Sequence, residues 1–180
     1  MKKLLKRIMA LSLCVCMITA FTLNASAATD FASNQDISLA PYTSACINVY
    51  GNDTIENNRN VCIWTEDGTT AQKWKYQTES NGYGCIKSLL NTRYALNVDR
   101  RSSMNWNCDV YEYSGNEADA SIQPYYYLNM YQYDGYTLKL VNWDKYLYAD
   151  SQYNNANIHW VDESVCEGSP YYVWDINVNG

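Results

Sequence analysis

Ala71-Gln72-Lys73-Trp74 sets the organisation of this chain, because weaker forms of it return further along. Gln123-Pro124-Tyr125 begins 51 residues after Gln72, and Tyr172-Val173-Trp174 begins 49 residues after Gln123. A near-constant period is typical of chains built from units that cannot bury their apolar faces alone. Three units are few for an open array, so the period favours a closed, threefold arrangement.

The first 27 residues have the pattern of a secretory signal. Four basic residues precede an apolar run over residues 8–23, and Ala25-Ser26-Ala27 offers small residues to a signal peptidase. The apolar run is short for a membrane span. We therefore predict export with cleavage near Ala27, and no membrane insertion. The remaining 153 residues would form a leader over residues 28–36 and one domain over residues 37–180.

Removal of this signal makes the chain strongly acidic. Residues 1–27 carry four of the 13 basic residues and no acidic one, so nine basic and 19 acidic residues remain, a net charge of −10. Nucleic-acid-binding surfaces are basic, which argues against a nucleic-acid partner. The chain has one His, and its last five Cys include no Cys-x-x-Cys pair. These counts argue against a structural metal, and we expect no cofactor.

The rest of the chain has the pattern of short strands. Runs rich in Tyr, Val, Ile, Leu and Thr are interrupted every 8 to 12 residues by Gly, Asn, Asp or Ser. Asn81-Gly82 and Asp134-Gly135 are dipeptides that favour hairpin turns. Together with the period, these signals predict an all-β chain of three repeats, each of about four strands, over residues 37–77, 83–126 and 136–177.

Two further strand motifs recur in the repeats. The first alternates apolar with other residues and is found as Cys46-Ile47-Asn48-Val49, Ala95-Leu96-Asn97-Val98 and Tyr146-Leu147-Tyr148-Ala149. In the second motif an apolar residue follows an Asn by three positions; these apolar residues are Ile63, Val110 and Ile158. The order of motifs is therefore the same in all three repeats.

This ordered set resembles a ricin-type β-trefoil lectin, a family also found as carbohydrate-binding modules in bacterial glycosidases. The resemblance covers nearly all of the chain after the signal, and its marker, Gln-x-Trp, is complete once, as Gln72-Lys73-Trp74. It implies a six-stranded barrel closed by three hairpins, which leaves no exposed strand edges. The core residues that it implies are Gln72, Trp74, Gln123, Tyr125 and Trp174.

The resemblance also implies one shallow sugar pocket in each repeat. Such a pocket combines an Asp from the first motif, an aromatic residue from the second motif and an Asn before the Gln of Gln-x-Trp. An aromatic ring contacts the C–H face of a sugar, while a carboxylate or amide binds two hydroxyls. The corresponding residues here are Asn48, Trp64 and Ala71 in repeat one, Asn97, Tyr111 and Ile122 in repeat two, and Tyr148, His159 and Tyr171 in repeat three.

No repeat has the complete set, but the first two keep an amide and an aromatic residue. Asp109 adds a carboxylate two residues before Tyr111, on the same face of the strand. In repeat three, Asp150 can replace Tyr148 if the strand slips, and Trp160 can replace His159. The predicted carbohydrate-binding residues are therefore Asn48, Trp64, Asn97, Asp109, Tyr111 and Asp150. Trp64 and Tyr111 can also be ordinary half-buried aromatic residues.

An exported chain enters a space where disulfides are allowed. The repeat alignment suggests Cys46–Cys62 within repeat one and Cys85–Cys108 within repeat two. Cys166 would then remain unpaired in a loop. Disulfide geometry provides the test of both pairings.

The function that the resemblance implies is a secreted lectin domain without catalytic activity. Its partners would be glycans, with galactosides, xylan-like and mucin-type sugars as candidates. The lone His and the absence of Gly-x-Ser-x-Gly and His-Glu-x-x-His motifs argue against an enzyme. A protein-binding trefoil, such as a protease inhibitor or a host-interaction factor, is the alternative, because one fold serves many functions.

Overall fold

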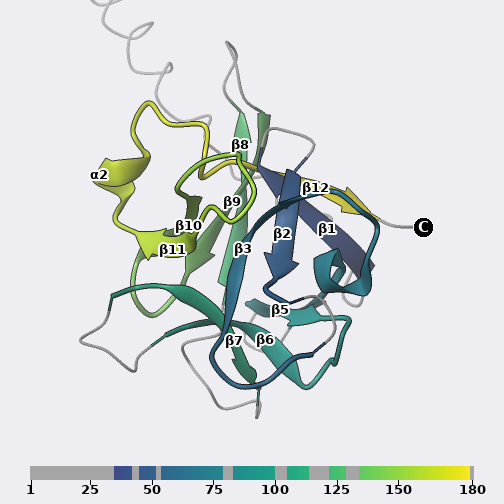
Figure 1. Ribbon diagram of the computed structural model, residues 1–180. Coiled ribbons are helices and arrows are strands. Elements are labelled where there is room, and N and C mark those ends of the chain that lie inside the picture. Colours follow the sequence, from purple (N-terminus) through teal and green to yellow (C-terminus); the bar gives the residue numbers. More distant parts are fainter. Residues whose placement is uncertain are drawn as a thin grey trace, which may run out of the picture.

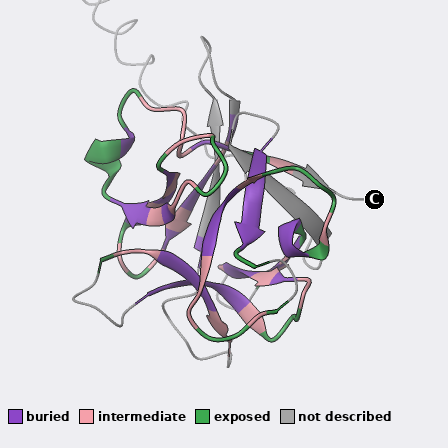
Figure 2. Ribbon diagram, viewed as in Figure 1, coloured by how far each residue is buried: buried purple, intermediate pink, exposed green. Residues whose placement is uncertain are grey.

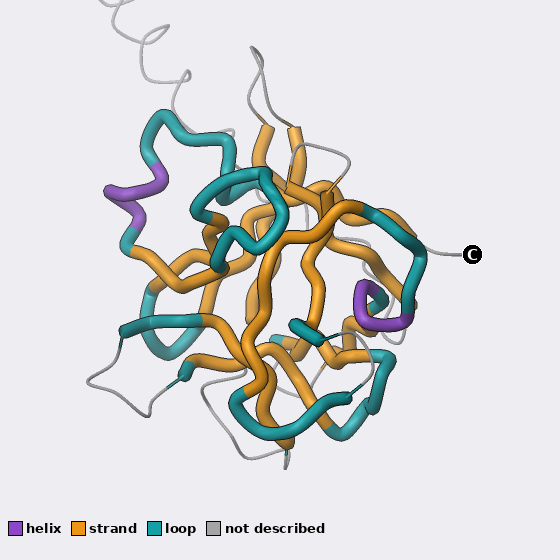
Figure 3. The backbone as a smooth tube through the Cα atoms, viewed as in Figure 1, coloured by secondary structure: helices purple, strands orange, loops and turns teal. Residues whose placement is uncertain are grey.

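The computed structural model describes residues 35–41, 45–51, 54–78, 83–99, 105–113, 122–128 and 134–178, with side chains at all of these except 35–41, 123–128, 134 and 177–178. The predicted signal and most of the leader lie outside the described residues. Strands dominate (Figure 1): β1 (Gln35–Pro41), β2 (Ala45–Val49), β3 (Arg59–Thr65), β4 (Trp74–Thr78), β5 (Gly84–Ser88), β6 (Tyr94–Val98), β7 (Cys108–Glu112), β8 (Ile122–Leu128), β9 (Asp134–Leu140), β10 (Lys145–Ala149), β11 (Ile158–Val161) and β12 (Trp174–Val178). The two short helices of the described part are η1 (Thr70–Gln72) and α2 (Glu163–Cys166) (Figure 3).

Six strands close into a barrel. β1 pairs with β4, β4 with β5, β5 with β8, β8 with β9, β9 with β12, and β12 returns to β1, all antiparallel. The strand order repeats every four strands, so repeat one holds β1 to β4, repeat two β5 to β8 and repeat three β9 to β12. A closed ring removes the strand edges that would otherwise be exposed. The predicted all-β, threefold barrel is confirmed.

The other six strands form three hairpins, β2–β3, β6–β7 and β10–β11, which we call the cap hairpins. Each cap hairpin binds the next through backbone hydrogen bonds. The Asn58 amide donates to the Val110 carbonyl at 2.8 Å, Ile63 to Ala156 at 2.9 Å, and Trp160 to Trp106 at 2.7 Å. These bonds join all three repeats in a second ring.

Three asparagines meet where the cap hairpins join. Asn157 Nδ2 donates to Asn107 Oδ1 at 2.6 Å, and Asn107 Nδ2 donates to Asn60 Oδ1 at 2.8 Å. All three side chains are half-buried. Because each residue stands directly before the same buried position of its hairpin, this amide chain links equivalent positions of the three repeats.

The core is built from equivalent residues of the repeats. Trp74 and Trp174 have no exposed surface, and their Nε1 atoms donate to the backbone carbonyls of Ile47 and Leu147, each at 3.1 Å. A buried indole that keeps a hydrogen-bond partner avoids the cost of a lost bond. Figure 2 shows that β2, which carries Ile47, is buried along its whole length. Gln123 and Tyr125 lie on β8, where their side chains are outside the described part.

The sequence prediction that Asp134-Gly135 is a turn is wrong. Both residues belong to β9, opposite Leu128 and Tyr127 of β8. A Cβ added to Gly135 would lie 2.9 Å from the carbonyl oxygen of Trp174 and 2.8 Å from the Val173 side chain. Close approach of the backbone of β12, and not turn geometry, therefore requires glycine here. The other predicted turn, Asn81-Gly82, lies outside the described residues.

The predicted disulfides are absent: none of the five cysteines of the described part forms a disulfide, and all five are buried. In the β2–β3 register Cys46 lies opposite Trp64, while Cys62 lies opposite Asn48. Cys46 and Cys62 are thus diagonal neighbours, for which side chains are about 7–8 Å apart, beyond disulfide geometry. Cys85 is on barrel strand β5 and Cys108 on cap strand β7, two strands that do not pair with each other.

These buried thiols predict alkaline instability. Burial raises the pKa of Cys46 and Cys166 from 9.0 to about 12, with nearby Glu66 and Glu163 adding to the respective effects. Thiols ionise near pH 9 in the unfolded chain but stay neutral in the native one, so the unfolding free energy falls as pH rises above 9. The expected slope is about 1.4 kcal/mol per pH unit for each thiol. Urea titrations from pH 8 to 11 should show a shallower decline for Cys46→Ala; identical slopes would contradict the assignment.

Candidate functional site

The outer faces of the cap hairpins are the candidate site of each repeat. Side chains alternate along a strand, so every second residue of each hairpin points away from the core. At the centre of this face the register pairs one residue from each strand; the pairs are Asn48 with Cys62, Asn97 with Asp109, and Tyr148 with His159. Equivalent positions therefore carry three different pairs of functional groups.

The register of repeat three differs from the sequence alignment by two residues. Ile47 lies opposite Ile63 and Leu96 opposite Val110, but Leu147 lies opposite Trp160 and not Ile158. Trp160 is consequently a core residue, with its Nε1 donating to the Asn97 carbonyl at 3.2 Å. Trp160 therefore does not take the place of His159 on the outer face. Val161, mostly buried, stands where Trp64 and Tyr111 stand in the other repeats.

The face of repeat one is covered. Asn48 is 2% exposed, and its Nδ2 donates to the adjacent Val49 carbonyl at 2.9 Å. Helix η1 packs against β2. Gln72 holds this segment in place, because its side chain donates to the Thr65 carbonyl and accepts from the Asp67 amide, each at 2.9 Å. Trp64 remains half-buried at the edge of the covered face.

The face of repeat two holds an enclosed amide and carboxylate. Asn97 Nδ2 donates to Asp109 Oδ1 at 3.1 Å and to the Val98 carbonyl at 2.8 Å. Asp109 has no exposed surface, and Asn97 is 6% exposed. The two groups predicted to bind sugar hydroxyls are thus joined to each other inside the protein, and Tyr111 lies half-buried two residues further along β7.

The face of repeat three is open and chemically mixed. His159 Nε2 lies 3.2 Å from Asp150 Oδ1, and these side chains are 30% and 51% exposed. The rings of His159 and Tyr148 are tilted against each other with centroids 5.6 Å apart. Asp150 follows β10 directly, and its backbone amide donates to the Asn157 carbonyl at 3.0 Å, which fixes the main chain from which the carboxylate projects.

The segment between α2 and β12 forms a second side of the repeat-three face. The Tyr148 hydroxyl is 3.1 Å from Ser169 Oγ, and the rings of Tyr148 and Tyr171 meet edge-to-face at 6.4 Å. We call Tyr148, Asp150, His159, Ser169 and Tyr171 the repeat-three cluster. Sequence reasoning named four of its members but missed Ser169. A signal for it was present, since Gly68 and Gly168 precede Thr69 and Ser169 at the same distance before Trp74 and Trp174.

The cluster offers aromatic faces, a carboxylate, an imidazole and hydroxyl groups at one exposed surface. Such a set can stack against an apolar ring face and hydrogen-bond hydroxyls at the same time. Across the described ranges, no three His, Cys, Asp or Glu side chains gather as a metal site would require. No helix within those ranges is both long and apolar enough to cross a membrane.

Comparisons with known proteins show the fold. No protein-family model and no curated protein matches the chain. The designed threefold-symmetric protein ThreeFoil is 20% identical, covering 81% of this chain and 99% of its own, with a TM-score of 0.64. A mosquitocidal holotoxin is 15% identical, covering 84% of this chain and 18% of its own, with a TM-score of 0.71. The C-half of the earthworm R-type lectin, solved with GalNAc, is 13% identical, covering 81% of this chain and 99% of its own, with a TM-score of 0.58. The chain therefore has the β-trefoil fold that the sequence predicted.

Proposed function

We propose that this β-trefoil is a secreted, non-catalytic glycan-binding domain whose main contact is the repeat-three cluster. The observation that carries the proposal is the half-exposed grouping of Tyr148, Asp150 and His159 on an otherwise largely covered set of hairpin faces. In this proposal the Asp150 carboxylate accepts hydrogen bonds from two hydroxyls of one sugar. The Tyr148 and Tyr171 rings supply an apolar surface for its C–H face.

His159 and Ser169 complete the polar side of the cluster. The imidazole holds Asp150 in place from one side, and Ser169 contacts the Tyr148 hydroxyl from the other. Prepositioned groups bind a ligand with less loss of conformational entropy than mobile ones. Asp150 was predicted as a sugar contact from the sequence, and this arrangement supports that role.

Repeats one and two contribute less than repeat three to glycan binding in this proposal. Their amides, Asn48 and Asn97, are enclosed, as is Asp109, so a sugar reaches them only after local rearrangement. Trp64 and Tyr111 remain predicted platforms at the edges of these faces, because both rings are half-buried. We expect Trp64→Ala and Tyr111→Ala to weaken glycan binding less than changes in the repeat-three cluster.

Galactosides are the first glycans to examine. The earthworm R-type lectin C-half, which has the same fold, was solved with GalNAc. Xylan-like and mucin-type sugars remain candidates from the sequence resemblance. The net charge of −10 after removal of the predicted signal favours neutral over anionic glycans, since like charges repel.

Asp150→Asn should weaken glycan binding about fivefold, because a charge-assisted hydrogen bond is worth about 1 kcal/mol more than a neutral one. The measurement is a glycan array on residues 28–180, followed by isothermal titration with each sugar that binds. Asp175→Asn is the matched control, since it removes one exposed carboxylate from barrel strand β12 and not from a cap hairpin. Equal affinities for the two variants would contradict the site. If the wild type bound no glycan on the array, the proposed glycan-binding function would be wrong.

A further inference from the structure

The turns that lead into β3 and β11 are alike, and the turn that leads into β7 differs from both. Each cap hairpin enters its second strand through a residue with positive φ: Asn58 at 67°, Asn155 at 67° and Trp106 at 58°. Asn tolerates this left-handed conformation, whereas a bulky side chain there is an outlier. The backbone hydrogen bonds from Ile63 to Ala156 and from Trp160 to Trp106 make Ala156, and not Asn155, the equivalent of Trp106. Trp106 is thus strained at a position where its equivalent Ala156 has no positive φ.

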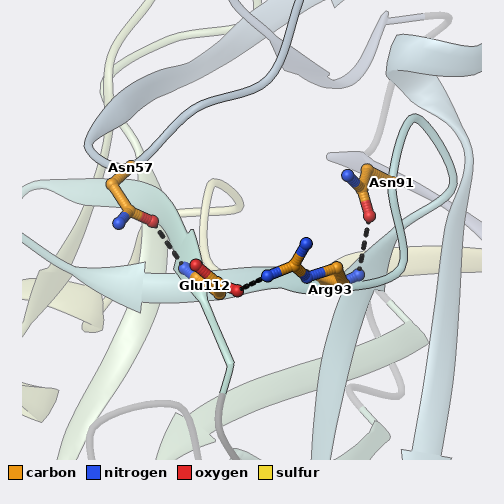
Figure 4. Close-up of polar contacts among 4 residues, drawn as sticks. All are labelled: Asn57, Asn91, Arg93 and Glu112. Atoms are coloured by element: carbon orange, nitrogen blue, oxygen red, sulfur yellow. Dashed lines mark hydrogen bonds and ion pairs between the residues drawn. The ribbon is translucent and has the colours of Figure 1, made fainter.

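At the turns that lead into β3 and β11, the preceding Asn binds the neighbouring repeat. Asn154 Oδ1 accepts from the backbone amide of Thr65 at 2.6 Å. Figure 4 shows the same arrangement for Asn57, whose Oδ1 accepts from the Glu112 amide at 2.8 Å, while the Glu112 carboxylate pairs with Arg93. Both side chains close the end of a neighbouring strand.

At the junction of repeats two and three, the residue in the position of Asn57 and Asn154 is Met104, which lies outside the described residues. Asn105, equivalent to Asn58 and Asn155, accepts through Oδ1 from the amide of Asn107 at 3.1 Å. Asp162 stands at the position of Thr65 and Glu112, and its Oδ1 is bound instead by Lys145 Nζ at 2.7 Å. The Asp162 side chain is 71% exposed, while that of Lys145 is 10% exposed.

Two indole rings from different repeats meet at this junction. Trp106 and Trp143 lie edge-to-face with ring centroids 5.4 Å apart and an interplanar angle of 70°. Lys145 Nζ lies 4.3 Å from the centroid of the Trp106 ring. Both indoles are half-buried. We call Trp106, Trp143, Lys145 and Asp162 the Trp106 corner.

We propose that the Trp106 corner is a second carbohydrate-binding site, separate from the repeat-three cluster and formed by residues of repeats two and three. The inference extends the proposed glycan-binding function and rests on it. Backbone strain is retained where it places a functional group, and here it places an indole beside a second indole. The corner therefore presents the exposed parts of two adjoining indoles, which also pack against the core, next to an exposed carboxylate.

The ligand class follows from the charges. The Lys145 ammonium is balanced by Asp162 and lies over the Trp106 ring, so the corner carries no net charge to attract an ion. Aromatic faces bind the C–H face of a sugar ring, and the exposed part of Asp162 accepts hydrogen bonds from hydroxyls. The occupant is therefore a neutral sugar residue, which makes the domain bivalent toward glycans that present several such residues.

Trp106→Asn tests the site, because it removes the indole while Asn tolerates the left-handed conformation that Trp106 adopts. We expect the melting temperature to change by only a few degrees, because relief of the left-handed strain offsets part of the packing that the indole loses against the core. We expect about a tenfold loss of affinity for multivalent neutral glycans, since a second linked contact multiplies affinity. Trp143→Leu is the second variant; it keeps apolar packing in the β9–β10 turn and removes the other ring.

The direct readout is the set of indole N–H resonances from the six tryptophans in ¹⁵N-labelled protein. The Trp106 signal is identified by its absence in Trp106→Asn. On titration with the array's neutral sugars it should shift together with that of Trp143, while signals of the enclosed Trp74, Trp160 and Trp174 stay in place. Asp150→Asn should leave these two shifts unchanged.

The outcomes separate the two proposals. If the wild type binds sugars but the Trp106 and Trp143 signals do not move, or if both variants keep full affinity, the second site is wrong and the repeat-three cluster stands. If the wild type binds no glycan, both proposals fail. Shifts that persist in Asp150→Asn and disappear in Trp143→Leu would establish the corner as a site of its own.

Discussion

Trp74→Ala should lower the free energy of unfolding by about 3–5 kcal/mol, the usual cost of removing a fully buried large aromatic side chain. Trp74 has no exposed surface, and its indole also satisfies the Ile47 carbonyl of a cap strand. The variant loses both the packing and this link between the barrel and its cap. Since small domains are stable by about 5–15 kcal/mol in total, the loss should be evident in urea titrations followed by circular dichroism.

Two comparisons make this prediction specific. Trp174→Ala should cost a similar amount, because Trp174 makes the equivalent bond to Leu147. Trp64→Ala should cost clearly less, because its ring is half-buried at the edge of repeat one. If Trp64→Ala destabilised the chain as much as Trp74→Ala, the threefold account of the core would be wrong.

Gly135→Ala should lower the free energy of unfolding by about 1–3 kcal/mol, as expected for an added methyl group in a filled space. The new Cβ would lie 2.9 Å from the carbonyl oxygen of Trp174, a backbone atom that cannot move without disturbing the β9–β12 contact of the barrel. Thermal unfolding of the purified variant measures the effect.

Gly68→Asn is the control for this glycine. Gly68 has φ of 74° and open space around its missing side chain, and Asn tolerates the left-handed region. The control should remain close to wild type in melting temperature. If Gly135→Ala changed the melting temperature as little as the control does, β9 and β12 would be able to separate without a loss of stability.

The arrangement of the candidate sites was predictable only in part. The sequence placed Asn97 and Asp109 on one face of a hairpin, and the structure joins them there by a hydrogen bond. It did not show that this pair is enclosed, because burial depends on the segments that fold over the hairpin. Ser169 was missed for the same reason, since it reaches Tyr148 only through the path of the chain between α2 and β12.

The pairing of cysteines shows another limit of sequence reasoning. Cys46 and Cys62 are near each other along the two strands of one hairpin, which makes a disulfide plausible from spacing. The register sets them diagonally, and burial leaves them as thiols with raised pKa values. A spacing argument cannot separate opposite from diagonal neighbours, although only the former lie within disulfide reach.

The sequence by itself determined the number of repeats, the order of strands within each and the aromatic residues around which they close, because these follow from period and from alternation of apolar residues. Only the tertiary structure decided the register of repeat three. Ile158 and Trp160 both point inward, so a shift of two residues preserves the alternating pattern and leaves the sequence signal unchanged. Trp160 pairs with Leu147 across the hairpin, and this pairing sets the register. In this register His159 lies beside Tyr148 on the open face.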